Sequence, residues 1–311
     1  METVTIGNGR ILAEMLHAHA GWTEGLSSGR RCILENETLS EAQLQNVNLK
    51  RAILRGTTLL DADLSGSDFS GASIDGGDFE RAILSAADFS GAQVSETRFS
   101  SCWMPAAFLT EAKIRNTVFK KANLRDGRLQ GVVIESCNFS GAELGSTSFH
   151  HARFATSDFS ESDFTNAQFP RTQMHACRFY AAKGAGANFS NGRLKACDFA
   201  KADLRGAKFS QADFGGSQFD RATLCEADFR EAQLKGVDFC RADLSYARFR
   251  GANLFATDLR GADLTGAREL TAAQLVQART DETTILPNGS RGPYHRSSGA
   301  ERPVFVGDPG Q

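Results

Sequence analysis

The sequence predicts an all-β solenoid, a four-sided (quadrilateral) parallel β-helix of about twelve coils, because the chain repeats itself at a fixed spacing. From Leu34 to Leu264, every fifth residue is Leu, Ile, Val, Met or Phe at 46 of 47 positions, and Gly184 is the exception. Two positions before each of these lies a small residue, most often Ala. Phenylalanine, in addition, recurs every 20 residues.

The five-residue unit indicates a short strand followed by a corner. A period of five fits neither the 3.6-residue repeat of a helix nor the two-residue alternation of a flat strand. The small and the large residue are two apart, so both point inward, and the remaining residues turn the chain. Of 20 glycines within 32–267, 14 occupy the second residue after the large one, where a turn with positive φ favours Gly.

The spacing of phenylalanine predicts four units in each coil. Phe occurs nine times in succession at 20-residue intervals from Phe79 to Phe239, and a second track from Phe69 to Phe249 is also mostly Phe. The two tracks between them are mostly aliphatic. Large side chains on two opposite faces and shorter ones on the other two would fill a narrow interior. Coils about 4.8 Å apart would also stack the aligned rings.

Gly184 leaves one coil without a large core residue. We expect the neighbouring Phe164 and Leu204 to fill the gap, because protein interiors are closely packed. A hinge or a small cavity is the alternative.

Both ends of the repeat are expected to be capped, because an uncovered solenoid end exposes unpaired backbone. Residues 1–31 form an N-terminal capping segment with a helix over 10–24, where apolar residues recur at helical spacing. The β-helix spans 32–267. Residues 268–286 form a C-terminal cap with a short helix that follows Thr271 as its N-cap. Capping helices favour a monomer over an end-to-end dimer.

The composition excludes several classes of protein. The formal net charge is −2, from 35 basic and 37 acidic residues, and a basic cluster over 113–128 would spread over different faces, so direct nucleic-acid binding is not expected. No apolar run approaches the roughly 18 residues that span a bilayer, so no membrane association is expected, and the N-terminus lacks a cleaved-signal pattern. Residues 287–311 are rich in Gly, Pro, Ser and Arg, and we expect disorder there.

The reactive residue types indicate neither a metal site nor catalysis. Seven cysteines, an odd number without a CxxC pair, favour reduced thiols and a cytoplasmic location. His150 and His151 lie at one predicted corner, and His175 lies at a different corner of the next coil. The many acids would stand on a convex, solvated surface without a cleft. We therefore expect no enzyme activity, no cofactor and no metal.

Single units of the repeat resemble those of the pentapeptide-repeat proteins. Ala62-Asp63-Leu64-Ser65-Gly66, Ala202-Asp-Leu-Arg-Gly and Ala262-Asp-Leu-Thr-Gly are similar to that family's A(D/N)Lxx repeat, and the resemblance covers 32–267. It implies a right-handed, four-sided β-helix. It implies no single activity, because the family has no shared catalytic residue.

An acidic stretch is the first candidate for a functional surface. Proteins of the quinolone-resistance type in this family resemble a DNA duplex in width and negative charge and bind DNA gyrase. This chain differs from them in its near-neutral charge, its uninterrupted coils and its N-terminal helix. The alternative interpretation is that Asp is simply a solvated residue of the repeat. The candidate DNA-mimic surface comprises Asp61, Asp63, Asp68, Asp75, Asp78 and Asp88.

Outward apolar residues are the second candidate, since the rest of the predicted surface is polar. Ile83 and Trp103 would share one outward column, Pro105 lies two residues further on, and Phe108 lies around the next corner. An exposed cluster centred on Trp commonly marks a contact site, and local packing is the alternative. The sequence thus predicts a non-catalytic protein–protein interaction scaffold whose partner it does not name. The alternatives are a DNA-mimicking modulator of a topoisomerase and a translocated bacterial effector that uses its tail for targeting.

Overall fold

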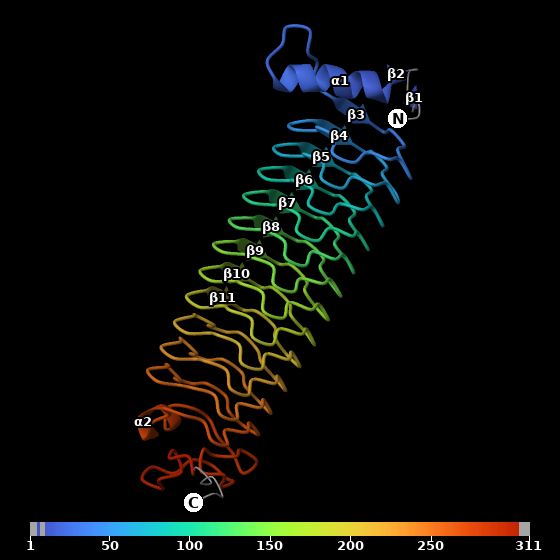
Figure 1. The fold of residues 1–311 in the computed structure, drawn as a ribbon. Helices are drawn as coiled ribbons and strands as arrows, with labels where there is room; N and C mark the ends of the chain where they lie inside the picture. Colours follow the sequence, from blue (N-terminus) through green and yellow to red (C-terminus); the bar gives the residue numbers. More distant parts are fainter. Residues whose placement is uncertain (1–4, 7–9, 305–311) are drawn as a thin grey trace, which may run out of the picture. The chain divides into compact units, whose positions relative to one another are not determined.

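The computed structural model describes residues 5–6 and 10–304 and forms a parallel β-solenoid with two short helices (Figure 1). Two compact units, 1–162 and 163–311, are described in turn. Within each unit, successive coils pair in parallel at a register of 20 residues, as Leu34 pairs with Leu54 in the first unit and Met174 with Leu194 in the second.

One face of the first unit is a ladder of three-residue strands. Neighbouring strands pair in parallel, with the central apolar residue buried and its two neighbours turned outward. These strands are β3 (Ile33–Glu35), β4 (Ile53–Arg55), β5 (Ser73–Asp75), β6 (Gln93–Ser95), β7 (Lys113–Arg115), β8 (Val133–Glu135) and β9 (Arg153–Ala155). Before them, β1 (Thr5–Ile6) and β2 (Arg10–Ile11) form a small antiparallel pair.

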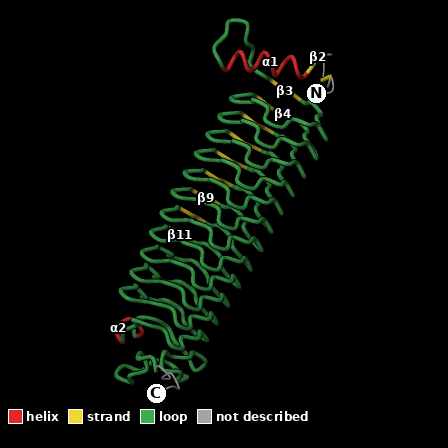
Figure 2. The backbone as a smooth tube through the Cα atoms, in the orientation of Figure 1, coloured by secondary structure: helices red, strands yellow, loops and turns green. Residues whose placement is uncertain are grey.

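The rest of each coil pairs through single bridges instead of strands, so most of the tube in Figure 2 is drawn as loop. Thr38 bridges Thr58, and further along the same coil Gln43 bridges Asp63. The corners between bridges are too tight for longer strands. The predicted five-residue unit is therefore a single inward-pointing pair of residues followed by a turn.

In the second unit, β10 (Gln173–His175) pairs with β11 (Arg193–Lys195), and single bridges continue the coils to Arg268. The helix α2 (Ala272–Leu275) follows. Its N-cap Thr271 accepts a hydrogen bond from the main chain of Gln274 and makes a capping box, which confirms the predicted helix start.

Each corner turns at the position where the sequence concentrates glycine. Gly71 has φ of 63°, and the N–H of Ala72 donates to the C=O of Phe69 (2.9 Å), an arrangement that suits a type II turn. The same left-handed conformation occurs at non-glycine corners such as Asp61 (φ 54°) and Arg81 (φ 59°). Glycine is thus favoured at the corner but not required there.

Stacked phenylalanines fill the interior as the 20-residue spacing predicts. In the first unit, Phe119 lies between Phe99 and Phe139, with ring centroids 5.0 and 4.6 Å away and nearly parallel planes. The two tracks also touch each other, since Phe69 meets Phe79 edge to face at 6.1 Å. The inward small residues are buried as well.

The gap at Gly184 is filled by a neighbouring ring. A Cβ built on Gly184 would lie 2.0 Å from Cε2 of Phe164, so the Phe164 ring occupies the space of the missing side chain. The structure therefore supports a filled gap over a cavity.

The helix α1 (Leu12–Thr23) covers part of the first coil, close to the predicted range. Its His19 is fully buried, stacks on Trp22 at 5.4 Å, and accepts a hydrogen bond at Nδ1 from the N–H of Cys32 (3.0 Å). This contact joins the helix to the start of the repeat. No helix among residues 5–6 and 10–304 is long and apolar enough to cross a bilayer.

The expectation of disorder over 287–311 is wrong for residues 287–304, while 305–311 lie outside the described residues. The N–H of Asn288 donates to the C=O of Ala300 (3.2 Å), and Ala300 is buried. Tyr294 donates to Glu301 (3.0 Å) through its hydroxyl. Composition misled here because backbone pairing with the last coil, not burial of large side chains, orders this segment.

Removing one ring from the Phe stack should destabilise the first unit. We expect Phe119→Ala to lower the free energy of unfolding by about 3–5 kcal/mol, because it leaves a cavity between two rings. Phe119→Leu should cost about 1–1.5 kcal/mol, since shape-conserving apolar substitutions are better tolerated. Urea unfolding followed by circular dichroism measures both. Equal losses for the two variants would contradict the stacking account.

The His19 contact should make the N-terminal cap sensitive to acid. Burial lowers the pKa of His19 below 6.5, so the unfolded segment binds a proton more readily than the folded one. The cap should hold its full stability above the unfolded pKa and lose stability as the pH falls below it. Amide exchange at Cys32, corrected for its intrinsic rate, should therefore accelerate between about pH 7.5 and about pH 5.5. His19→Leu should abolish this pH dependence.

Candidate functional site

The structure brings the predicted apolar residues together on two neighbouring outward columns. The Trp103 column contains Asp63, Ile83, Trp103 and Asn123, each bridged to the next coil. The Phe108 column contains Asp68, Asp88, Phe108 and Arg128, bridged in the same way. Pro105 lies in the corner between the two columns. We call Ile83, Trp103, Pro105 and Phe108 the apolar patch.

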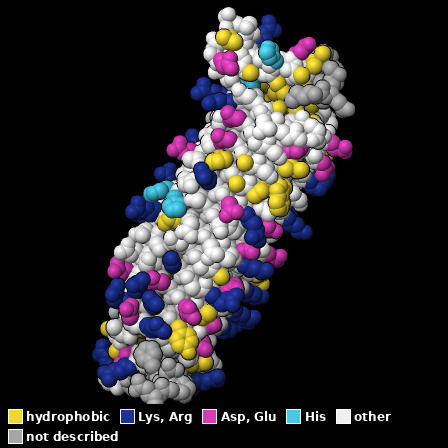
Figure 3. Space-filling view, in the orientation of Figure 1, with side chains coloured by type: hydrophobic (Ala, Val, Ile, Leu, Met, Phe, Trp, Pro, Cys, Tyr) yellow, Lys and Arg dark blue, Asp and Glu magenta, His cyan; other side chains and the backbone are white. Residues whose placement is uncertain are grey.

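Trp103 is the most exposed member of the apolar patch. Its surface is 53% exposed and that of Ile83 is 39% exposed, on a surface otherwise composed of polar side chains. The indole has no aromatic, cationic or hydrogen-bonding partner within the part of the chain that the structure describes. Figure 3 shows hydrophobic side chains gathered in this way on the upper part of the visible face. Neither a widened corner nor the described N-terminal segment covers the ring.

Phe108 and Pro105 are half-buried, so they contribute less free surface. The guanidinium of Arg128 lies over the Phe108 ring, 5.0 Å from its centroid, as a cation–π contact. The sequence analysis placed Arg128 only in a basic cluster. Its position one coil after Phe108 was the signal for this contact.

The acidic residues do not form one surface. Asp61 pairs with Arg81 (2.7 Å) and Asp78 pairs with Arg98, so two of the six are neutralised. Asp75 lies on the strand face and accepts a hydrogen bond from Ser95 (2.5 Å). The other three, Asp63, Asp68 and Asp88, lie on the two columns of the apolar patch and border it on one side.

A structural task explains why Asp so often precedes the central residue. Asp68 accepts a hydrogen bond from the N–H of Ser70 (2.8 Å), and Asp88 accepts one from Ser90 (2.8 Å), so each carboxylate caps the following corner. Partial burial pulls the pKa of Asp63 upward, but hydrogen bonds from Ser65 and Gln45 outweigh it and hold that pKa below its ordinary value. These carboxylates stay ionised at neutral pH.

Metal-binding and nucleophilic groups do not converge. Over residues 5–6 and 10–304, no three His, Cys, Asp or Glu side chains lie together as metal ligands would. Burial raises the pKa of Cys137 to about 11, so that thiol is not a ready nucleophile. Five cysteines are buried at the small-residue position, as the repeat predicted.

A groove that the sequence analysis missed lies at the N-terminal end of the first unit. It has a volume of about 740 Å³ and is bounded by Leu12, Ala13 and Leu16 of α1 and by residues 38–45 of the first coil. The signal was available: the first coil has no preceding unit, and a single helix is too narrow to cover a whole coil. We call it the N-terminal groove.

Comparison with known proteins identifies the family. A model of pentapeptide repeats, in 8 copies, matches residues 30–61, 62–100, 95–131, 107–141, 217–254 and 232–268, and a pentapeptide repeat region matches 152–229. The chain belongs to the pentapeptide-repeat family. No catalytic family is indicated by these matches. No curated protein matches this sequence.

Several solved pentapeptide-repeat structures are similar to this pentapeptide-repeat protein. HetL, involved in heterocyst differentiation regulation in the cyanobacterium Nostoc sp. strain PCC 7120, is 23% identical with a TM-score of 0.39, covering 88% of this chain and 96% of HetL. QnrB1, a plasmid-mediated fluoroquinolone resistance protein, is 20% identical with a TM-score of 0.26 over 55% of this chain and 85% of its own. A protein of the Arabidopsis thaliana thylakoid lumen is 26% identical with a TM-score of 0.27 over 39% and 70%.

Proposed function

We propose that this protein is a non-catalytic scaffold for protein–protein interaction and that a protein partner docks on the apolar patch. The observation that supports it is Trp103, whose indole is 53% exposed beside Ile83. Burying a large, rigid aromatic ring against a partner yields much of the binding free energy of a typical interface. The ionised border of Asp63, Asp68 and Asp88 would keep the patch soluble while it is free.

A regular coil would make the patch a rigid platform. We propose a right-handed, four-sided helix of about twelve coils, since four five-residue units fill each 20-residue register. Buried, reduced cysteines suit a cytoplasmic location in a bacterial cell, and capped ends suit a monomer.

The alternative of a topoisomerase-directed DNA mimic would use the acidic residues instead. Its support is Asp63, Asp68 and Asp88, which lie on adjacent columns. The pairing of Asp61 with Arg81 reduces the negative charge that such mimicry needs. The translocated-effector alternative would depend on the segment after Pro287, and deleting 288–311 while measuring export tests it.

Removing the exposed rings should abolish partner binding without unfolding the protein. We expect Trp103→Ser with Phe108→Ser to weaken the partner by about 30-fold or more, because central aromatic residues typically contribute at least about 2 kcal/mol. Affinity capture from the native host's lysate identifies the partner, and calorimetry with the purified partner measures the loss. The matched control is Phe255→Ser, which removes an equally exposed ring (54%) outside the patch.

Three charge reversals separate the two candidate functions. If Asp63→Lys, Asp68→Lys and Asp88→Lys together abolish binding to DNA gyrase while the Trp103 and Phe108 variant still binds it, the DNA-mimic function is correct. A partner that both ring variants and wild type capture equally would refute the role of the apolar patch.

A further inference from the structure

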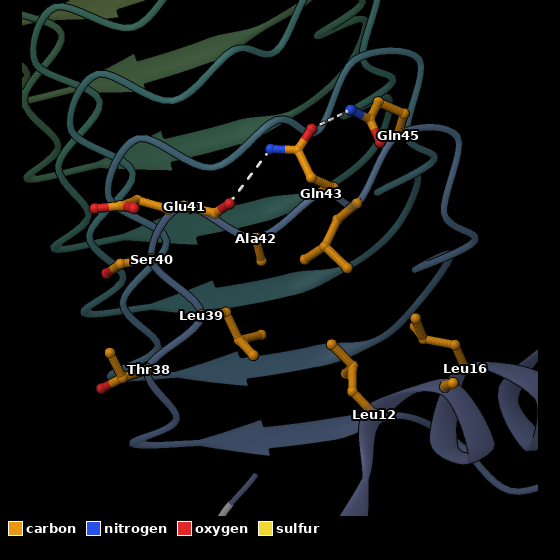
Figure 4. Close-up of a pocket in the computed structure, with 11 residues that line it drawn as sticks. Leu12, Leu16, Thr38, Leu39, Ser40, Glu41, Ala42, Gln43 and Gln45 are labelled. Carbon is orange, nitrogen blue, oxygen red and sulfur yellow. Dashed lines mark hydrogen bonds between the residues drawn. The ribbon is translucent and has the colours of Figure 1, made fainter. Parts of the chain in front are cut away.

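The N-terminal groove joins an apolar floor to an edge of backbone. Leu12 and Leu16 of α1 point toward Leu39 of the first coil, and the backbone from Thr38 to Gln45 forms the other wall (Figure 4). Leu12 and Leu39 are buried, and Leu16 is half-buried. A chain lying along this wall would therefore contact leucine side chains on its inner side.

The backbone along this wall is the open edge of a β-ladder. In the second coil, the N–H of Thr58 donates to Glu37 (2.8 Å) and that of Asp63 donates to Ala42 (3.0 Å). The matching N–H groups of the first coil have no acceptor among the described residues, and the matching C=O groups accept no main-chain N–H there. These groups are the N–H of Thr38 and Gln43 and the C=O of Thr38, Ser40, Gln43 and Gln45.

An open edge of this kind is an invitation to a further strand. Unpaired N–H and C=O groups in a row bind another extended chain, and most proteins block them for that reason. Here α1 crosses the coil beside the edge, since Asn48 donates to Thr23 (3.1 Å) and Cys32 to His19, but residues 38–45 stay uncovered.

The C-terminal end of the same chain shows what closes such an edge. Leu259 and Leu264 take the same places in the 20-residue repeat as Leu39 and Leu44. Their N–H groups donate to the C=O of Arg279 and of Ile285 (2.8 Å each), in a segment beyond the repeat.

That closing segment pairs in parallel with the coil through the bridges Asp258 to Arg279 and Asp263 to Ile285. It turns Thr284 and Leu286 inward, and both are buried. A parallel segment with a small residue followed two positions later by a large apolar one therefore fits these two faces.

We propose that the N-terminal groove binds an extended peptide segment of a partner protein, which pairs in parallel with residues 38–45 as an added strand. Its main chain would supply hydrogen bonds to the open edge, and its large apolar residues, five apart, would lie above Leu39 and Leu44 and against Leu16. This site is separate from the apolar patch, so it stands whether or not a partner docks on Trp103.

A peptide with the sequence of residues 257–267, TDLRGADLTGA, is the probe, because it has two large residues at the required spacing. Added to the full-length protein, it should slow amide exchange at Thr38 and Gln43 by about 10-fold or more once bound. The same peptide with N-methyl groups on its two leucine amides lacks the donors for the C=O of Thr38 and Gln43. It should bind at least about 10-fold more weakly.

Two variants of α1 complete the test by fluorescence anisotropy with a labelled peptide. Leu16→Arg fills the groove and should weaken binding by about 10-fold, whereas His17→Arg, an exposed neighbour outside the lining, should change it by less than about two-fold. Unchanged exchange at Thr38 and Gln43, equal binding of the N-methylated peptide, or equal effects of the two variants would each overturn the proposal.

Discussion

Main-chain hydrogen bonding between coils at a fixed register of 20 residues is the constraint on which the rest of the structure depends. Each coil donates to and accepts from its neighbours on every face, as Leu39 donates to Thr58 and Thr58 donates to Glu37. Because backbone groups do this work, the side chains have two separate tasks. Inward ones must fill a narrow interior, and outward ones are almost unconstrained.

That division explains where function can reside. Outward residues at one repeat position form a column, so a column can change character within two or three coils, as Asp63, Ile83 and Trp103 do. An acidic residue in such a column also caps the corner after it, which means that acidity alone does not indicate a binding surface. An exposed indole has no such structural task, and it is therefore the more informative residue.

The ends obey the same constraint in the opposite sense. A coil without a neighbour leaves donors and acceptors open, and the chain deals with its two ends differently. The C-terminal segment pairs through Arg279 and Ile285, while at the N-terminus the contact of His19 with Cys32 anchors a helix that leaves residues 38–45 uncovered. An open ladder edge beside leucine side chains is consequently a structural feature of the N-terminal end.

The sequence by itself determined the solenoid, the stacking of Phe119 between its neighbours, the capping box at Thr271 and the column that joins Ile83 to Trp103. These follow from periodicity, because a fixed register converts sequence spacing directly into spatial adjacency. Only the tertiary structure decided the order of residues 287–304, the pairing of Asp61 with Arg81 and the N-terminal groove. Each of these depends on rotamers or on how a non-repeating segment meets the last coil, and no repeat period specifies either.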